Sequence, residues 1–288
     1  MAEAQIIPHL GNIALQKLDT ADIQSWHGKL LASGGKGGRS LSARTVGHAH
    51  RVLHRALARA VAGKKVFRNV ANIEKPPRVD DVEVAILRGE QIGTVLDKLA
   101  GHALYPIVIT ALGTGLRRGE LMALAWSAVN LDTGTVWVER SVEETKAGLR
   151  FKPPKSKAGR RTVPLSPEVI DALREHRRGQ LETRVALGLG KLPEDALVFC
   201  GPEGGPMSPD KLSRDWSRLV VSRKLPKVSF HALRHTHVSI LIDEGLDVLS
   251  VSRRIGHGSP ALTLKVYSHL FSCKDDRAVA AISRALRR

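Results

Sequence analysis

TGLRRGEL, residues 114–121, contains Arg117 at the point where the chain is expected to enter a helix, and two glycines bracket this point. Glu120 follows Arg117 by about one helical turn, so the two side chains can meet. A guanidinium held by a nearby carboxylate is preorganised to bind an oxyanion. An ordinary surface ion pair has the same spacing, so this stretch alone leaves both interpretations open.

A second motif, HALRH at 231–235, places His231 and Arg234 three residues apart on one helix face. His231 and His235 have the spacing of two zinc ligands, but that motif needs a glutamate where this chain has an alanine. An arginine between two ligands would also repel a cation. We therefore expect no metal here, and we interpret His235 and His237 as core histidines with satisfied hydrogen bonds.

A third motif, GHGSPALTLKVYSHL at 256–270, contains one of the chain's two tyrosines. Tyr105 lies in an apolar run and is expected in the core, whereas Tyr267 has polar neighbours that suit a reactive hydroxyl. His257 precedes Tyr267 by ten residues across a proline, which is enough chain to bring both into one site. A lone tyrosine is far more often structural than nucleophilic, so this motif does not decide the question by itself.

Between these motifs, LRFKPPKSKAGRRTVPL at 149–165 predicts a strand, a basic turn and another strand, and TVWVER near 135–140 predicts a further strand. A lysine on such a turn can deliver a proton to a leaving oxygen. Contacts to phosphate explain most of these lysines and arginines equally well.

The net charge of +17 indicates a polyanionic partner, and the excess is densest over residues 1–80, with 13 Lys and Arg against 5 Asp and Glu. Aromatic residues make up only 4%, which favours backbone contacts to duplex DNA over base stacking. Two cysteines are too few for a disulfide framework or a zinc cluster. No apolar run approaches the ~20 residues that span a bilayer, so we expect a cytoplasmic protein with no membrane partner.

The first third of the chain predicts two helices, one capped by Thr20 and one running from Ser42 to Gly63. The second has an apolar face and a face whose charges are all positive, which we interpret as a DNA-binding surface rather than a merely solvated one. Its members are Arg44, His48, Arg51, Arg55 and Arg59. EKPPRVDD at 74–81 is typical of a linker, because paired prolines resist helix formation.

Taken together and in this order, the motifs resemble those of the tyrosine recombinase (phage integrase) family over essentially the whole chain. The resemblance implies a mainly α fold with a small β-sheet. Residues 1–75 resemble the all-helical, SAM-like core-binding domain, 76–81 a linker, and 82–288 the mixed α/β catalytic domain. The sequence begins inside what resembles the first core-binding helix, so we expect either a trimmed N-terminus or an element without arm-site binding.

The resemblance also implies a mechanism, in which Tyr267 attacks a DNA phosphodiester and leaves a 3′-phosphotyrosyl link, with no cofactor, metal or ATP. His231 is then the candidate base, Arg117 and Arg234 the phosphate clamp, and His257 a further phosphate contact. By alignment, Lys155 is the proton donor to the leaving oxygen, with Lys157 as the alternative. Glu120 supports the site, and Lys157 and Arg160 are expected to contact DNA.

The expected function is integration of a phage or other mobile element at duplex attachment sites, by a homotetramer in the synaptic complex. Host DNA-bending factors and an excisionase are candidate partners. A dimer-resolving recombinase of the same family and a catalytically inactive DNA-binding relative are the alternatives; the full set of site residues argues against the second.

Overall fold

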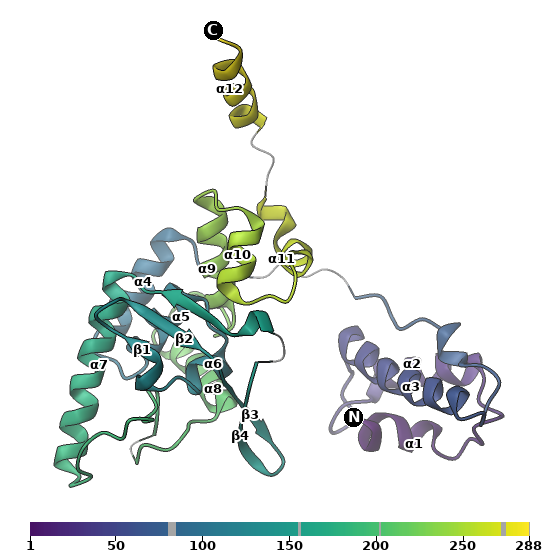
Figure 1. Cartoon of the computed structure of the whole chain (residues 1–288). Coiled ribbons are helices and arrows are strands. Elements are labelled where there is room, and N and C mark those ends of the chain that lie inside the picture. The colour runs from purple at the N-terminus through teal and green to yellow at the C-terminus, as the bar shows by residue number, and fades with distance from the viewer. Residues whose placement is uncertain (80–84, 155–156, 202, 272–274, 288) are drawn as a thin grey trace. The chain divides into compact units, whose positions relative to one another are not determined.

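The computed structural model describes residues 1–79, 85–154, 157–201, 203–271 and 275–287. Contacts divide the chain into two compact units, Met1–Glu83 and Val84–Arg288, which are described separately (Figure 1).

The first unit is helical. Its described elements are η1 (Ala2–Ile6), α1 (Ile7–Leu10), α2 (Thr20–Ser33), α3 (Ala43–Ala62) and η2 (Val70–Asn72). Trp26, Leu30, Leu53 and their neighbours form its buried core, because apolar residues recur every three or four positions on the facing sides of α2 and α3. Ser42 caps α3 as predicted. The cap of α2 is Asp19 rather than Thr20, because the Asp19 carboxylate accepts a hydrogen bond from the backbone of the third helical residue.

The second unit is a set of helices around two small antiparallel sheets. Its described helices are α4 (Gly89–Leu99), α5 (Tyr105–Thr114), α6 (Arg118–Met122), α7 (Pro167–Ala186), α8 (Pro209–Ser222), α9 (Ala232–Asp243), α10 (Val248–Ile255), α11 (Pro260–Tyr267) and α12 (Asp275–Leu286), with the short turns η3 (Trp126–Ala128), η4 (Lys157–Gly159) and η5 (Ser268–Leu270). The apolar α5 packs against both α7 and α9, and it also contacts α6, which follows it directly in the chain.

The strands pair differently from the prediction. The three-stranded sheet has the order β1 (Val129–Asn130), β2 (Thr135–Val138), β5 (Arg161–Pro164), and β3 (Ser141–Thr145) pairs with β4 (Gly148–Lys152). The basic turn therefore connects two sheets instead of closing a hairpin. The physical reason is burial, since Val163 of β5 faces the core opposite Val136 of β2. The mainly α fold class with small antiparallel strands is confirmed, with two sheets in place of one.

No described helix combines the length and the apolar character that crossing a membrane requires.

Candidate active site

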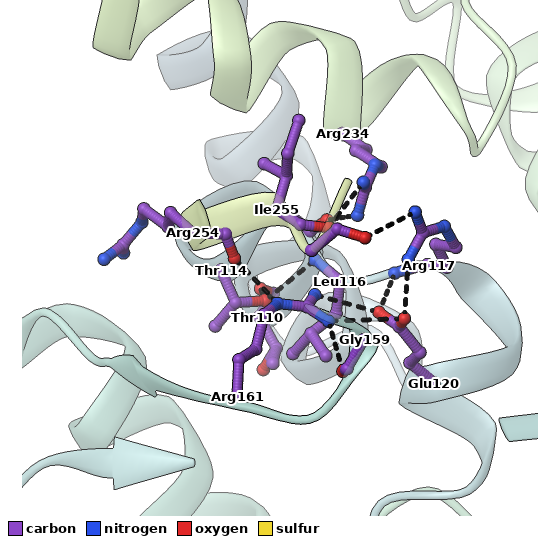
Figure 2. Close-up of polar contacts among 12 residues, drawn as sticks. Thr110, Thr114, Leu116, Arg117, Glu120, Gly159, Arg161, Arg234, Arg254 and Ile255 are labelled. Atoms are coloured by element: carbon purple, nitrogen blue, oxygen red, sulfur yellow. Dashed lines mark hydrogen bonds and ion pairs between the residues drawn. The ribbon is translucent and has the colours of Figure 1, made fainter. Parts of the chain in front are cut away.

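The carboxylate of Glu120 lies at the centre of a charged cluster. Glu120 is only 4% exposed and accepts hydrogen bonds from the backbone and the guanidinium of Arg117, at 2.9 and 2.8 Å. Nη2 of Arg161 donates to the same carboxylate at 3.0 Å, so two guanidiniums point at one acid (Figure 2). Burial alone would raise the pKa of Glu120, but Arg161 and Arg117 outweigh it and hold that pKa below its usual value. Glu120 is therefore an anion that orients two arginines.

Arg161 was not among the residues predicted from the sequence. It is the first residue of β5, and its side chain is buried because Arg161 and Val163 share the inner face of that strand. Its Nε donates to the carbonyl oxygen of Arg254 at 2.7 Å, which ties β5 to the end of α10. The alternation in RTVP was the available signal, because it places an arginine on a core-facing position that needs a buried acid.

Arg117 and Arg234 are held by neighbouring carbonyl oxygens. Nη2 of Arg117 donates to Gly256 at 3.2 Å, and its side chain remains 39% exposed. Arg234 is 3% exposed and donates to Gly115 at 2.6 Å and to Ile255 at 2.7 Å (Figure 2). Burial, then the charge of Arg117, lowers the pKa of Arg234 to about 9, so it stays protonated at neutral pH.

Two glycines make this packing possible. Gly115 ends α5 and Gly256 ends α10, both in the left-handed conformation with φ of 64° and 67°. A Cβ at Gly115 would lie 2.6 Å from the His237 ring, and one at Gly256 would lie 2.6 Å from Nη1 of Arg161. A side chain at Gly115 would therefore displace His237, and a side chain at Gly256 would displace Arg161.

Tyr267 is the last residue of α11, and it is buried rather than in the polar setting that its neighbours in sequence suggested. The residue is 3% exposed and packs with Val238, Ile242, Val251 and Ile255. Its hydroxyl lies 2.5 Å from Nδ1 of His235. Burial raises the pKa of Tyr267 to about 12, with Arg234 acting in the opposite direction. The structure therefore holds a protonated tyrosine against a histidine.

The other two predicted histidines belong to the same cluster. His231 is exposed at the start of α9, and its ring meets that of His235 edge-on, with centroids 4.9 Å apart. Partial desolvation and then Arg234 lower the pKa of His231. Nδ1 of His257 lies 2.9 Å from the hydroxyl of Thr263, and desolvation followed by Arg234 and Arg117 lowers its pKa to about 4.

His235 was interpreted from the sequence as a core histidine, and it instead contacts the Tyr267 hydroxyl. Its pKa is lowered to about 4 by desolvation, His231 and Arg234, in that order. His237 does have the satisfied hydrogen bonds that the sequence predicted, to Leu112 and Arg254. His231 and His235 lie one helical turn apart, so the sequence alone did not indicate which of the two rings contacts Tyr267.

The remaining predicted residues lie elsewhere. Lys155 lies outside the described residues, as does the side chain of Lys157, whose backbone begins η4. Arg160 is exposed. The five basic residues predicted on α3 are all exposed: Arg44, His48, Arg51, Arg55 and Arg59. The sequence of α3 contains no acid. Over the described ranges, no three His, Cys, Asp or Glu side chains gather into a possible metal site.

Three guanidiniums around one carboxylate give the cluster a net positive charge beside Tyr267. Such an arrangement can hold a phosphate next to a tyrosine hydroxyl, which is the class of site that phosphoryl transfer to a protein side chain requires. The model of the phage integrase family matches residues 87–273. The chain therefore belongs to the phage integrase family of tyrosine recombinases.

Individual relatives agree with this assignment. An integrase of Streptomyces ambofaciens is 30% identical over 275 residues, covering 93% of this chain and 69% of the relative. A tyrosine recombinase XerC-like protein of Caldanaerobacter subterraneus subsp. tengcongensis is 28% identical, covering 72% of this chain. This chain spans only 56% of the length of that second relative.

Solved structures show the same fold. The Tn1549 transposon integrase in complex with a circular intermediate DNA has a TM-score of 0.79 at 22% identity, covering 96% of this chain and 88% of that one. A lambda integrase dimer bound to a core site has a TM-score of 0.66 at 17% identity, covering 94% and 85%.

Proposed function

We propose that the chain is a site-specific DNA recombinase that breaks and rejoins duplex DNA through a covalent bond from Tyr267 to a 3′-phosphate. The observation that supports this most is the Tyr267 hydroxyl, which is held by a histidine. Among the described residues of that cluster, Arg117, Arg161 and Arg234 outnumber the acid Glu120. Burial is the main reason that the pKa of His235 and of His257 is lowered to about 4, and the neighbouring arginines contribute the part that an incoming phosphate would offset.

In the proposed reaction, the Tyr267 oxygen bonds to phosphorus while the bond from phosphorus to the 5′-oxygen breaks. The product is a 3′-phosphotyrosyl link and a free 5′-hydroxyl, and because the link conserves the bond energy, a second 5′-hydroxyl can reseal it without ATP. Arg117 and Arg234 stabilise the charge on the non-bridging oxygens, with two parallel hydrogen bonds available from each guanidinium. His257 hydrogen-bonds the same phosphate, His231 is the base that the sequence motif implies, and Lys155 protonates the leaving oxygen.

DNA binding is proposed for both units. Residues 1–75 supply the core-binding domain, in which the exposed arginines of α3 neutralise phosphates, and residues 82–288 supply the catalytic domain. Lys157 and Arg160 contact the DNA backbone near the cut. Because each neutralised phosphate releases a counterion, binding depends steeply on salt.

The biological role we propose is integration of a phage or other mobile element, in the cytoplasm of a bacterium. The names of several relatives support it, among them the integrases of Streptomyces ambofaciens and of Mycobacterium phage L5. A lambda integrase tetramer has been solved on a Holliday junction, and we propose the same assembly for this protein on its attachment sites. Host bending factors and an excisionase are the proposed accessory partners.

The test is to incubate the protein with a library of random-sequence duplexes, denature the mixture, and sequence the DNA that stays covalently attached. Attached DNA that shares one sequence and ends in a 3′-phosphate is the expected result. A parallel incubation with Tyr267→Phe must yield none, because only the nucleophilic oxygen has been removed. No attached DNA from the unmodified protein, at concentrations where it binds duplex, would contradict the proposal.

A further inference from the structure

Among the described residues, the Tyr267 hydroxyl is hydrogen-bonded to His235. The sequence motif suggested His231 instead. Nδ1 of His235 lies 2.5 Å from the hydroxyl oxygen, and the two rings lie 5.5 Å apart between centroids. His231 comes four residues earlier and contacts His235 rather than Tyr267. The order along the cluster is therefore His231, His235, Tyr267.

The neighbouring groups are engaged elsewhere or cannot accept a proton. Nδ1 of His257 faces the Thr263 hydroxyl. Arg234 donates to two carbonyl oxygens, and a guanidinium has no acceptor. Among the described residues, His235 is thus the group placed to receive a proton directly from Tyr267.

Burial fixes this contact. Tyr267 belongs to one buried apolar cluster with Val238 and Ile242 of α9 and with Val251 and Ile255 of α10. His235 lies on α9 between the buried residues Arg234 and Thr236, so its backbone is held by the core on both sides. The two side chains meet on rigid helices, as precise positioning of a nucleophile requires.

Building on the proposed function, we infer that His235 orients the Tyr267 hydroxyl and accepts its proton as Tyr267 attacks the DNA phosphate. The O–H bond of Tyr267 breaks as the bond from its oxygen to phosphorus forms, and the proton moves to Nδ1 of His235. The electron pair of the broken phosphorus–oxygen bond leaves with the 5′-oxygen, which is protonated separately. On resealing, His235 returns its proton to Tyr267.

In the free protein the proton stays on Tyr267. His235 has a pKa of about 4 and is neutral at pH 7, so its ring can accept, and Tyr267 with a pKa of about 12 keeps its proton until DNA arrives. A phosphate bound beside the arginines would offset the positive field that contributes to the low pKa of His235. The nucleophile is therefore stored in its inactive, protonated form in the free protein.

Three substitutions separate orientation from proton transfer. His235→Asn keeps an acceptor near the position of Nδ1, His235→Gln moves the acceptor to the position of Nε2, and His235→Ala removes it. None of them can take a proton, so each should slow single-turnover cleavage by roughly a hundredfold or more, with duplex affinity unchanged. Unaltered circular dichroism shows that each variant is folded.

The pH profile gives a readout that a structural role would not change. Cleavage by the unmodified protein should vary little between pH 6 and 8, because His235 remains neutral. In the variants only ionised tyrosine attacks, so the rate should rise by about tenfold per pH unit. A substrate with sulfur in place of the leaving 5′-oxygen needs no proton donor. It should restore cleavage by Lys155→Ala, but it should not restore cleavage by the His235 variants.

A second measurement does not depend on activity. Nitrogen-15 NMR of the histidine rings should show His235 protonated on Nε2 with Nδ1 as acceptor, and Tyr267→Phe should shift that Nδ1 signal. A His235 ring protonated on Nδ1 would overturn the inference, and so would His235→Asn or His235→Ala cleaving at the normal rate. If the unmodified protein forms no covalent adduct, the proposed function fails instead, which is a separate outcome.

Discussion

Nη2 of Arg161 lies 3.0 Å from Oε2 of Glu120, although the two residues are 41 positions apart in the sequence. Both side chains are almost completely buried. This ion pair joins the start of β5 to the helix that begins after Arg117. Glu120 also binds Arg117, which is proposed to bind the DNA phosphate. The ion pair therefore connects the folded core of the second unit to a phosphate-binding residue.

Glu120→Gln should destabilise the second unit by roughly 3–5 kcal/mol, because it leaves the buried guanidinium of Arg161 without a counter-charge. Denaturant unfolding measures this directly. Glu182→Gln, at an exposed position on α7, is the matched control and should change stability by no more than about 0.5 kcal/mol. Equal stability of the two variants would show that Arg161 finds another partner.

Stability should fall as the pH drops from 6.5 towards 4, because buried His237 has a folded pKa of about 4, well below its ordinary 6.5. The unfolded chain binds the proton first, so this contribution is complete above pH 6.5 and is lost as pH approaches 4. Its size is on the order of 3 kcal/mol. Glu120, with its lowered pKa, adds a loss of the same sign at still lower pH. His237→Gln should reduce the pH slope by up to one proton; an unchanged slope would exclude His237 as its source.

Arg117→Lys and Arg234→Lys should each slow single-turnover cleavage by roughly a hundredfold or more, equivalent to ~2.7 kcal/mol of transition-state stabilisation. An ammonium cannot reproduce two parallel hydrogen bonds, and in Arg234 it also cannot span the carbonyl oxygens of Gly115 and Ile255. Thermal melts identify loss of the fold. Near-normal cleavage by folded Arg117→Lys would show that this residue only binds DNA.

Replacing Arg51, Arg55 and Arg59 by alanine should weaken duplex binding and flatten its salt dependence. For roughly eight phosphate contacts the log–log slope is about −7, and each lost contact should remove about one unit. Alanine is a good helix former, so α3 should persist.

The control for that triple variant is Arg174, Arg178 and Arg218 replaced by alanine, since these exposed arginines already pair with acids on their own helices. Its salt slope should match that of the unmodified protein. If the α3 variant also keeps its affinity and slope, the cations of α3 face away from DNA.

The sequence predicted what depends on local spacing. The helix at Ala43–Ala62 follows from apolar periodicity and its cap, and the contact of Arg117 with Glu120 follows from one helical turn. The class of fold followed from the order of the motifs.

Contacts between distant segments were not predictable in the same way. Arg161 reaches Glu120 only because β5 pairs with β2 instead of β4, and pairing of short strands depends on burial that the sequence does not specify. Likewise, His231 and His235 lie one turn apart at the start of α9 and have the same side chain. The packing of α11 against α9 and α10 determines which of the two rings contacts Tyr267.

The most direct test of the account is to identify the amino acid that carries the DNA. The protein is incubated with a cleavable duplex, the adduct is denatured and digested with protease and nuclease, and the peptides are sequenced by mass spectrometry. We predict a nucleotide 3′-phosphate attached to the oxygen of Tyr267. A phosphate attached to another residue, or cleavage that leaves no phosphopeptide, would contradict the account.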